Sequence, residues 1–421
     1  MQYAFILGRV YTLSIAEIIV VLKKYEFTFK ILGISPEALV IETETQLDFE
    51  KIQRELGGTV KIVKIIDVVK KRAQDSINFA LQNYFKPSKL KKDYFKDYSG
   101  KKQFGVSVYL LDMQIKAFGE PRRLGMFIKK SLQADGASLR ACLPEFNSLA
   151  LASVVVTKNL ILQKGAEICI IADTTKIYAG RTLIVQDFED YGRRDYQRPV
   201  RDEKQGMIPP KVAQIMLNFT SLPVGKNILD PFCGIGTILQ EGILLGYKML
   251  GSDINKSAIA GSETNLEWFR NRYKAPNGKY KVETADVGVV SKTFKDDKIA
   301  AIVTEGSLGP MYGKMPAQAE IDANFKDLTE LWTKSFKEFK KILPVGARVV
   351  VCIPAYRRFN GEYVFLPTVD FITKLGYSIE DHFPQAVRDL APFLKITERK
   401  SMIYDRKDQV VAREIITFIN N

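Results

Sequence analysis

The chain has 421 residues, of which 46% are hydrophobic and 26% are charged, so we expect a folded protein of two or three domains. Its 62 lysines and arginines against 48 acids give a net charge of +14, which favours a polyanionic partner over an acidic protein or a neutral small molecule. One histidine and four scattered cysteines disfavour a histidine-based triad, a zinc site and a secreted disulfide framework. We therefore expect a cytoplasmic protein without a metal.

The first 75 residues predict a small α+β domain of ferredoxin-like type. Glu17 interrupts the apolar start, which also lacks a cationic flank and a cleavage site, so we expect neither a signal peptide nor a membrane anchor. Hydrophobic periodicity predicts strands at 3–8, 38–44 and 59–69 and helices at 14–25 and 47–58. Ser14, with Glu17 three residues later, predicts the cap of the first helix. We expect this domain to be a scaffold, because it contains no chemical motif.

Lysines alternate with aromatic residues between Ser76 and Gly105. The residues concerned are Lys86, Lys89, Lys91, Lys92, Lys96, Lys101 and Lys102, with Tyr84, Phe85, Tyr94, Phe95 and Tyr98. Two interpretations have equal weight. Either the lysines grip phosphates while the rings stack on bases, or the run is a solvated face whose rings pack inward.

A second α+β domain is expected at residues 76–185. The patterns predict strands at 104–111, 138–144, 167–173 and 177–185 and helices at 122–136 and 147–160. The helix at 122–136 has a basic face, which begins with Arg122 and Arg123.

Residues 186–206 are too polar and too rich in turn formers for a core element, so they predict a linker. The linker contains four arginines, which are Arg193, Arg194, Arg198 and Arg201. These arginines either touch RNA or pair with the neighbouring acids, and the sequence does not favour one over the other.

Residues 207–421 alternate strands and helices as a doubly wound, mostly parallel α/β sheet does. The predicted strands are 227–230, 248–253, 279–284, 299–304, 347–354 and 377–382. The predicted helices are 207–220, 237–245, 256–272, 320–342 and 366–375. The segments SMIYDR and QVVAREIITF predict an antiparallel hairpin at the end.

The stretch NILDPFCGIGT, residues 227–237, predicts a strand, a tight turn and the start of a helix. Glycine lets such a turn approach a ligand closely, and the helix start presents unpaired N–H groups to it. A phosphate-binding loop would need Lys-Ser or Lys-Thr after the last glycine, and a dinucleotide fingerprint would need a third glycine where Leu239 stands. Asp230 suits a cationic amino-acid group instead.

A second acid, Asp253, ends the next strand in MLGSDIN. At that strand end an acid is placed to accept hydrogen bonds from both ribose hydroxyls of a nucleoside. An amino-acid site and a ribose site together indicate S-adenosylmethionine. A strand-turn-helix without a ligand is the simpler alternative, and the paired Asp253 disfavours it.

The segments DPFCGIGT and GSDIN resemble the first two motifs of class I S-adenosylmethionine-dependent methyltransferases, in the DPFxGxGT form. The preceding segment RDYQRPVRDEKQGMIPPKVAQIMLNF resembles the one found in THUMP-containing tRNA guanosine-N2 methyltransferases. The resemblance covers residues from about 104 to the C-terminus. It implies a Rossmann-like catalytic domain at 207–421 and a THUMP-like domain that binds tRNA, at its acceptor end.

The cofactor residues that this resemblance implies lie at the ends of successive strands. They are Asp230, Phe232, Gly234, Gly236, Thr237, Asp253, Ile254, Asp286 and Val287. Asp286 is placed to accept a hydrogen bond from the adenine amine, although an acid in a surface turn is the alternative.

The fourth strand ends in IVTEGSLGPMYGK, where the resembled family carries Asp or Asn, two prolines and an aromatic residue that hold a flipped base. This chain has Glu305 for the acid, Gly306 and Ser307 for the prolines and Leu308 for the aromatic residue. A stacking ring must then come from elsewhere, and Tyr312 is the nearest candidate. The candidate catalytic residues are therefore Glu305, Ser307, Leu308 and Tyr312.

We predict from the sequence a tRNA methyltransferase that acts on an exocyclic base amine, namely guanosine N2. The alternatives are an adenine-N6 DNA methyltransferase and an RNA-binding protein whose methylase domain has lost activity. No nucleophilic cysteine is needed, and Cys352 lies in an apolar run that predicts core. The candidate RNA contacts are Lys89, Lys91, Lys92, Arg122 and Arg123.

Overall fold

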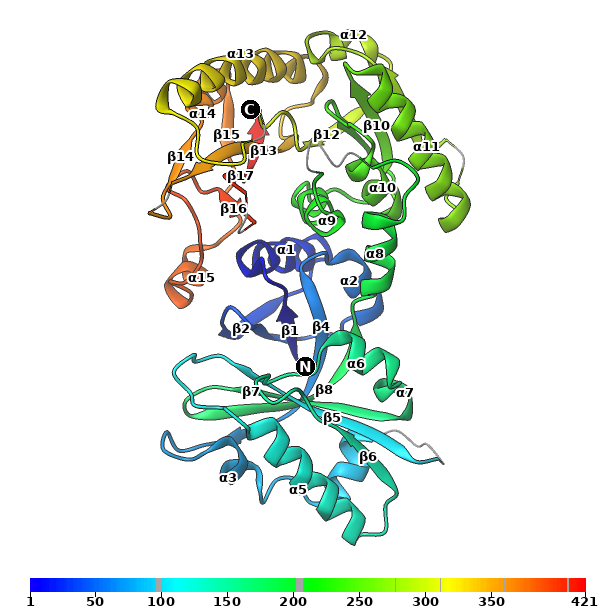
Figure 1. Ribbon diagram of the computed structural model, residues 1–421, viewed down its shortest axis with the longest axis vertical. Helices are drawn as coiled ribbons and strands as arrows, with labels where there is room; N and C mark the ends of the chain where they lie inside the picture. The colour runs from blue at the N-terminus through cyan, green and yellow to red at the C-terminus, as the bar shows by residue number, and fades with distance from the viewer. Residues whose placement is uncertain (96–99, 202–206, 277, 311, 359, 407–408) are drawn as a thin grey trace. The chain divides into compact units, whose positions relative to one another are not determined.

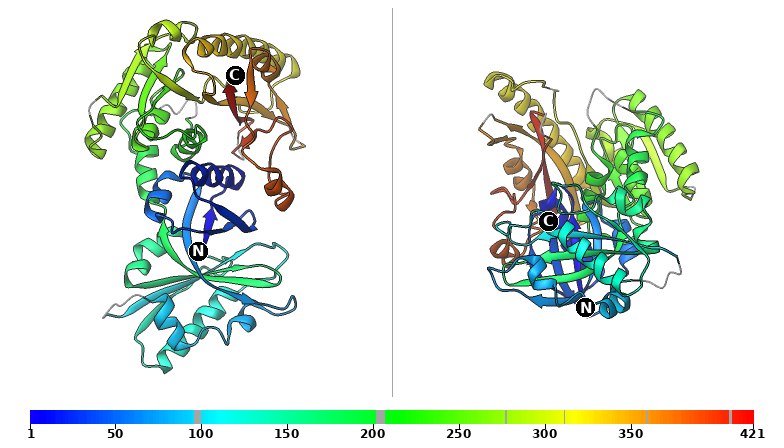
Figure 2. Two further views of the ribbon diagram at one scale, coloured as in Figure 1. Left: turned by 180° about the vertical axis from the view of Figure 1, so that it is seen from behind. Right: turned by 60° about the horizontal axis from the view of Figure 1, so that its bottom comes forward.

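The computed structural model describes residues 1–95, 100–201, 207–276, 278–310, 312–358, 360–406 and 409–421 (Figures 1 and 2). The chain divides into two compact units. Unit 1 comprises Met1–Ile15, Tyr25–Phe188 and Ala386–Phe393, and unit 2 comprises Ala16–Lys24, Glu189–Gln385 and Leu394–Asn421.

The strands of the first 185 residues form one eight-stranded sheet in the order β2-β3-β1-β4-β8-β7-β5-β6. They are β1 (Gln2–Leu7), β2 (Phe29–Ile34), β3 (Ala38–Thr43), β4 (Thr59–Lys70), β5 (Lys102–Leu110), β6 (Leu139–Cys142), β7 (Gly165–Ala172) and β8 (Lys176–Val185). The antiparallel pair β4 and β8 joins the strands of residues 1–70 to those of residues 102–185. The division into domains at 1–75 and 76–185 stays a prediction.

Helices cover the strands of this sheet, and α3 and α5 lie along one side of it (Figure 1). The helices before residue 190 are α1 (Tyr11–Lys24), α2 (Phe49–Glu55), α3 (Ile77–Leu81), α4 (Pro87–Lys89), the π-helix η1 (Leu90–Tyr94), α5 (Glu120–Ala134), α6 (Ser153–Lys158) and α7 (Ile161–Lys164). A buried ion pair crosses the sheet, since the Lys61 amine of β4 lies 2.5 Å from the Glu167 carboxylate of β7. The hydroxyls of Ser107 and Thr182 also donate to Glu167.

The structure corrects several sequence predictions in the first 200 residues. Helix α1 begins at Tyr11, so Ser14 is not its cap but an interior residue whose hydroxyl donates to the Val10 carbonyl. Strand β2 was not predicted, and the helix predicted at 147–160 is two short helices separated by Leu160, whose backbone is left-handed at φ 53°. The predicted linker contains the helix α8 (Phe188–Tyr196).

Most of the aromatic residues between Asn83 and Gly105 that the structure describes pack inward. Phe85, Tyr94 and Phe95 are buried and belong to the core beneath α5, and the Tyr84 hydroxyl contacts that of Tyr94 at 2.9 Å. Lys96 and Tyr98 lie outside the described residues. The interpretation in which these rings stack on bases is therefore wrong for Phe85, Tyr94 and Phe95.

Unit 2 contains a twisted sheet in the order β11-β10-β9-β12-β13-β17-β15, with β14 and β16 paired at its side. Its strands are β9 (Asn227–Asp230), β10 (Lys248–Asp253), β11 (Tyr280–Thr284), β12 (Ile299–Thr304), β13 (Arg348–Arg357), β14 (Tyr363–Phe365), β15 (Tyr377–Ile379), β16 (Met402–Tyr404) and β17 (Val411–Asn420). The first five run parallel, and β17 runs antiparallel to β13 and β15. The predicted doubly wound fold with a terminal hairpin is confirmed.

The later helices are α8, α9 (Pro210–Phe219), α10 (Thr237–Leu244), α11 (Lys256–Tyr273), the 3₁₀ helix η2 (Val287–Val289), α12 (Val290–Thr293), α13 (Gln318–Ile342), α14 (Thr368–Lys374) and α15 (Gln385–Leu390). Trp332, Phe336 and Phe339 of α13 are completely buried against the sheet. Burying one such ring stabilises the fold by about 1.5–3 kcal/mol, so α13 is a main support of unit 2.

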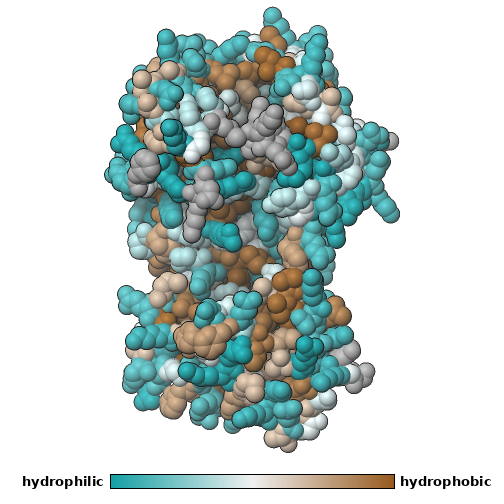
Figure 3. Space-filling model, in the orientation of Figure 1, coloured by the Kyte–Doolittle hydropathy of each residue, from teal (hydrophilic) through white to brown (hydrophobic). Residues whose placement is uncertain are grey.

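Hydrophilic and apolar residues are intermixed on the face drawn in Figure 3. Among the described residues, no helix combines the length and the hydrophobicity that a membrane-spanning segment requires. Phe118 and Phe146 of unit 1 are 60% and 69% exposed, yet their rings contact each other edge to face with centroids 5.2 Å apart.

Candidate active site

Three acids lie at the ends of neighbouring parallel strands in unit 2. Strand β9 lies between β10 and β12, with Asp230 opposite Gly251 and Leu229 opposite Ile302. Asp230 ends β9, Asp253 ends β10, and Glu305 follows β12 directly. Because parallel strands end at the same edge of a sheet, the three carboxyl groups face one region, where ligands of such folds bind.

The turn after β9 is built around two glycines. Gly236 has φ 86°, and a Cβ there would lie 2.6 Å from the Ser262 hydroxyl of α11, so no larger residue fits. A Cβ on Gly234 would meet nothing within 4 Å, so the turn faces open space on that side. The helix α10 begins at Thr237, whose hydroxyl accepts a hydrogen bond from Arg198.

Asp230 is a buried acid without a basic partner among the described residues. Its side chain is stabilised by the Phe232 amide, 3.2 Å away, and by the Thr304 hydroxyl. Burial raises the pKa of Asp230 to about 7, and the negative charges of Asp253 and Glu305 act in the same direction. A cation at this position would relieve the cost of burying the ionised form.

Asp253 connects the ends of β10 and β9. One carboxylate oxygen accepts from the Gly234 amide at 3.0 Å, and the other accepts from the Asn255 amide at 2.9 Å. Each oxygen keeps a further lone pair for a ligand. The next side chain, Ile254, is 70% exposed and offers an apolar surface beside that carboxylate.

Asp286 and Val287 have structural roles that the sequence did not show. One oxygen of Asp286 accepts from the Lys334 amine and the Gly288 amide, both at 2.7 Å. The hydrogen bond with Lys334 lowers the pKa of Asp286. The side chain of Val287 is in the core. Contacts of Asp286 and of the Val287 backbone with an adenine ring stay predictions.

Glu305 is fixed in place by groups that the sequence analysis did not single out. Arg413 of β17 forms an ion pair with its carboxylate at 2.5 Å, and the Ile208 amide donates to the other oxygen at 3.2 Å. Burial raises the pKa of Glu305, and Arg413 opposes that effect. Arg413 is itself 2% exposed. The sequence contained one signal for this pairing, because Arg413 is a charged residue within a largely buried strand.

Gly306, in the loop after Glu305 and at the first position where the resembled family carries proline, cannot be replaced by proline because of its backbone and because α13 lies beside it. Gly306 has φ 63°, and a Cβ there would lie 2.4 Å from the indole ring of Trp332. Proline cannot adopt a positive φ. Trp332 also contacts the ring of Phe232, with centroids 5.7 Å apart, so one buried side chain supports both the glycine turn and this loop.

The other candidate catalytic residues of this loop, Ser307, Leu308 and Tyr312, follow Glu305 closely in the chain. The Ser307 hydroxyl accepts from the Gly309 amide at 3.4 Å. Leu308 is partly exposed. Tyr312 is half-buried, and its ring lies 5.9 Å from that of Tyr356. The catalytic roles of Ser307, Leu308 and Tyr312 stay predictions.

The histidine and Cys352 lie in the core, and Cys233 of the glycine turn is buried, which raises its pKa. The single histidine, His382, is buried and stacked on Phe219, and burial lowers its pKa to about 4. Cys352 is completely buried in β13, and burial raises its pKa, so the prediction that it belongs to the core is confirmed. Among the described residues, no group of three histidines, cysteines or acids is arranged to hold a metal ion.

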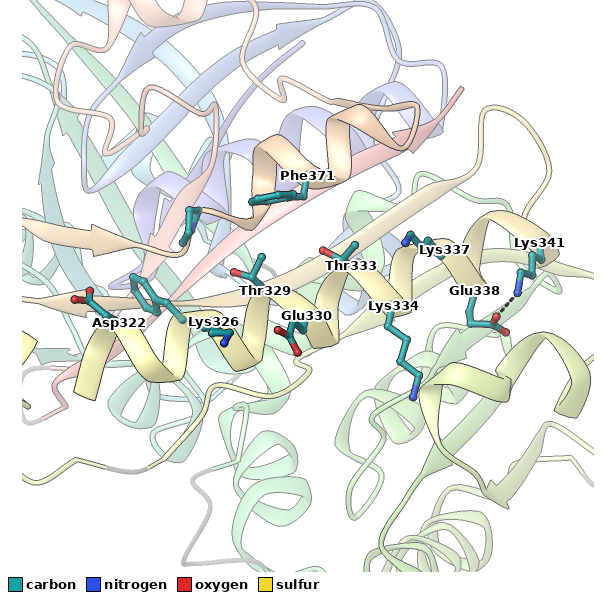
Figure 4. Close-up of a pocket in the computed structure, with 12 residues that line it drawn as sticks. Asp322, Lys326, Thr329, Glu330, Thr333, Lys334, Lys337, Glu338, Lys341 and Phe371 are labelled. Atoms are coloured by element: carbon teal, nitrogen blue, oxygen red, sulfur yellow. Dashed lines mark hydrogen bonds and ion pairs between the residues drawn. The ribbon is translucent and has the colours of Figure 1, made fainter. Parts of the chain in front are cut away.

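A cavity of about 880 Å³ is lined by residues of α13 and by Pro367 and Phe371, and it does not lie at the strand edge. Thr329 and Thr333 of α13 face Phe371 of α14 across this groove (Figure 4). None of the candidate site residues lines it. We therefore assign no part of the active site to the groove.

Comparison with known proteins agrees with this geometry. Residues 198–361 match the RMKL-like methyltransferase domain, and residues 126–264 match a DNA methylase model. The chain is 25% identical to a tRNA (guanine(10)-N2)-dimethyltransferase of Pyrococcus abyssi over 237 residues, 53% of this chain and 61% of the relative. It is 31% identical to a probable tRNA (guanine(10)-N2)-dimethyltransferase of Methanothermococcus thermolithotrophicus over 125 residues, 30% of this chain and 74% of the relative. Two further archaeal relatives are matched over 35% of their length.

The crystal structure of TrmN from Thermus thermophilus has the same fold, with a TM-score of 0.55, 11% identity and 100% of both chains covered. The sheet and its three-acid edge define a class I methyltransferase domain, and the cofactor of that domain is S-adenosylmethionine. The chain belongs to the tRNA guanine-N2 methyltransferase family.

The residues at the strand edge fit this cofactor. Asp230 is a buried acid that lacks a cation, and the amino group of S-adenosylmethionine supplies one. The open side of the turn at Gly234 gives the cofactor room, and Asp253 has lone pairs for the ribose hydroxyls. The exposed Ile254 suits the adenine face. These assignments of individual residues stay predictions.

The pKa of Asp230 generates a test of its role. Only the ionised carboxylate attracts the amino group, and only the protonated amino group is a cation, so affinity for S-adenosylmethionine should rise about fivefold between pH 6 and pH 7 and fall again above about pH 8. Calorimetric titration measures this. Asp230→Asn should abolish the rise in affinity with pH. Asp253→Asn should lower the affinity at every pH but keep that rise. An affinity independent of pH in the wild-type protein would contradict the assignment.

Proposed function

We propose that this protein transfers a methyl group from S-adenosylmethionine to the exocyclic N2 amine of a guanosine in tRNA. The observation that carries the proposal is the carboxylate of Glu305, which forms an ion pair with Arg413 at the strand edge beside the glycine turn. The names of the curated relatives support the substrate. We also infer a cytoplasmic location, where tRNA is methylated, from the chain's composition.

For this reaction the protein must position the amine against the methyl group and stabilise the positive charge that develops on the amine. S-adenosylmethionine supplies an activated methyl group, because its sulfonium is a good leaving group. The amine nitrogen bonds to the methyl carbon as the carbon–sulfur bond breaks, and the nitrogen then loses a proton to water. Glu305 accepts a hydrogen bond from the amine and stabilises the positive charge that grows on it. Tyr312 offers a ring for the flipped base.

The ion pair with Arg413 supports this role of Glu305 because it holds the carboxylate in one orientation. One carboxylate oxygen faces Arg413 and the other accepts from the Ile208 amide, so the side chain cannot rotate freely. Each oxygen still has a second lone pair, which can receive the amine. A carboxylate fixed before the substrate arrives loses little entropy when it binds, and this favours catalysis by positioning.

The direct test is methyl transfer from labelled cofactor to unmodified tRNA, duplex DNA and single-stranded DNA, followed by identification of the labelled nucleoside. We expect N2-methylated guanosine from tRNA. Glu305→Gln keeps the size of the side chain but removes its charge, so turnover should fall by about 10- to 1000-fold with ligand binding nearly unchanged. Glu263→Gln, an exposed change on α11, serves as the control.

Two results would redirect the proposal. Labelled N6-methyladenine in DNA would favour the alternative that the DNA methylase match suggests. Binding of both ligands without transfer to any nucleic acid, and no effect of Glu305→Gln, would favour an RNA-binding protein that has lost activity.

The RNA surface that we propose lies in unit 1, within the region 76–185 that we interpret as THUMP-like. Two of its candidate lysines have acidic partners, since Lys89 lies 2.6 Å from Asp67 and Lys91 lies 2.6 Å from Asp135. Lys92 is exposed, and no contact of its amine is recorded among the described residues. These lysines can contribute a diffuse positive field, but two of them are partly neutralised.

A better defined surface lies at the start of α5. Phe118 and Phe146 form an exposed edge-to-face pair, and their rings offer apolar faces to water. Arg123 is exposed, and its guanidinium lies within 4 Å of the position that a Gly119 side chain would occupy, next to Phe118. Arg122 donates to the Pro144 carbonyl at 2.7 Å, two residues from Phe146. Rings that stack on bases and arginines beside them are a typical combination for single-stranded RNA.

This surface predicts the effect of removing the rings. Because base stacking on an aromatic ring contributes about 1–3 kcal/mol, Phe118→Ala and Phe146→Ala should each weaken tRNA binding by about 5- to 150-fold. Fluorescence anisotropy with labelled tRNA measures this. Phe371→Ala, which changes an exposed ring of unit 2, is the matched control. Unchanged affinity in the double variant would show that the pair is not an RNA surface.

A further inference from the structure

Strands β7 and β8 separate at one end of the sheet of unit 1. Their antiparallel ladder ends at the pair of Ile168 and Arg181. Strand β7 nevertheless begins three residues earlier, at Gly165, and β8 continues to Val185. The two strands therefore leave an opening between them instead of pairing over their full length.

A cavity of about 240 Å³ lies at this opening. Its lining includes Gly165 and Ala166 from β7 and residues 181–183 from β8. The register between β8 and β4 also shifts here, so that Leu183 has no residue opposite it. A bulge of this kind redirects side chains and is frequent beside functional sites. The cavity thus results from an irregularity of the sheet itself.

Two cationic side chains line the cavity from neighbouring strands. Lys64 of β4 and Arg181 of β8 are directly opposite each other, so they project from the same face of the sheet. Like charges in such a pair destabilise a sheet. Neither side chain forms an ion pair within the parts of the chain that the structure describes, and Arg181 donates only to the Tyr94 carbonyl, at 3.4 Å. Both side chains keep donors for an anion.

A second like-charged pair in the same ladder shows that the cavity is the distinguishing feature. Lys70 of β4 faces Lys176 of β8 at the other end of the ladder. The Lys176 amine lies over the ring of Tyr178, 5.2 Å from its centroid. Neither lysine lines the cavity. We therefore use Lys70 and Lys176 as a matched control and assign them no ligand.

The lining of the cavity indicates which anion fits. Among the residues that the structure describes, no acid lines it, and Gln46 adds an amide to the two cations. A phosphomonoester carries a charge of about −1.5 to −2 at pH 7, which matches two cations better than the single charge of a backbone phosphodiester. Arginine also binds phosphate through two parallel hydrogen bonds. The volume is below the range of about 300–1,000 Å³ for whole ligands, so it suits a phosphate and the sugar that carries it.

We propose that the opening between β7 and β8 binds a phosphomonoester, whose phosphate is held by Arg181 and Lys64 together. Such a group occurs on free sugar phosphates and at the 5′ end of an RNA. The site uses none of the residues of the strand edge in unit 2. A failure of methyl transfer would therefore leave this inference standing, and the two proposals can be tested separately.

Calorimetric titration of the full chain with ribose 5-phosphate and with ribose tests the site. We expect the wild-type protein to bind only the phosphorylated sugar. Arg181→Gln and Lys64→Gln should each weaken that binding by about 10- to 150-fold, as expected for the loss of a hydrogen bond to a charged group. Lys70→Gln and Lys176→Gln remove the same charges from the same two strands and should leave the affinity unchanged.

Thermal unfolding provides a measurement that also reports on folding. Ribose 5-phosphate should raise the melting temperature of the wild-type protein and of both control variants, because a ligand stabilises the state that binds it. It should not raise that of Arg181→Gln or Lys64→Gln. Lys64 is exposed, so its replacement is expected to fold even if Arg181→Gln does not.

Two forms of tRNA identify the source of the phosphate. If tRNA with a 5′-phosphate binds the wild-type protein more tightly than tRNA with a 5′-hydroxyl, and Arg181→Gln removes the difference, the ligand is an RNA end. Equal affinity for the two forms, together with binding of ribose 5-phosphate, identifies a free phosphomonoester. If the wild-type protein binds ribose 5-phosphate no better than ribose, or if the control variants lose as much affinity as Arg181→Gln and Lys64→Gln, the proposal is wrong.

Discussion

The ion pair between Glu305 and Arg413 is the interaction on which the active site depends. It joins the loop after β12 to β17, the last strand of the sheet, although 108 residues separate the two side chains along the chain. Removing one partner of a buried pair typically costs about 3–5 kcal/mol, because it leaves the other charge uncompensated. The terminal strand β17 thus supplies the positive charge that opposes the effect of burial on the pKa of Glu305 and holds its carboxylate in place.

Other charged groups at the strand edge are also buried or half-buried, and each of these is held by specific partners. Asp253 binds backbone amides of two strand ends, and Asp286 is held by Lys334 of α13. Asp230 is the exception, since it accepts hydrogen bonds from the Phe232 amide and the Thr304 hydroxyl but has no basic partner among the described residues. A buried acid of this kind is a candidate functional group, and the contact of Asp230 with the amino group of the cofactor stays a prediction.

The sequence predicted the framework of unit 2 well, because its strands are short apolar runs that end in acids or glycines. Strands β9, β10 and β12 have the predicted bounds. Contacts between distant segments could not be predicted, and these include the pairing of Arg413 with Glu305. The helix α8 was missed because its polarity suggested a linker, whereas ion pairs with Asp190 and Glu241 allow Arg194 of that helix to be buried. The sequence could not explain why glycine replaces the family's proline at position 306. The structure explains it, because the ring of Trp332 lies beside Gly306.

A crystal structure with S-adenosylhomocysteine bound would test the central claim most directly. The account predicts the ribose hydroxyls within hydrogen-bond distance of Asp253 and the amino-acid group at the turn between Asp230 and Thr237. It also predicts that the sulfur faces the Glu305 carboxylate. Density for the ligand in the groove along α13, or a bound ligand that leaves Asp253 and Glu305 without contact, would contradict the account.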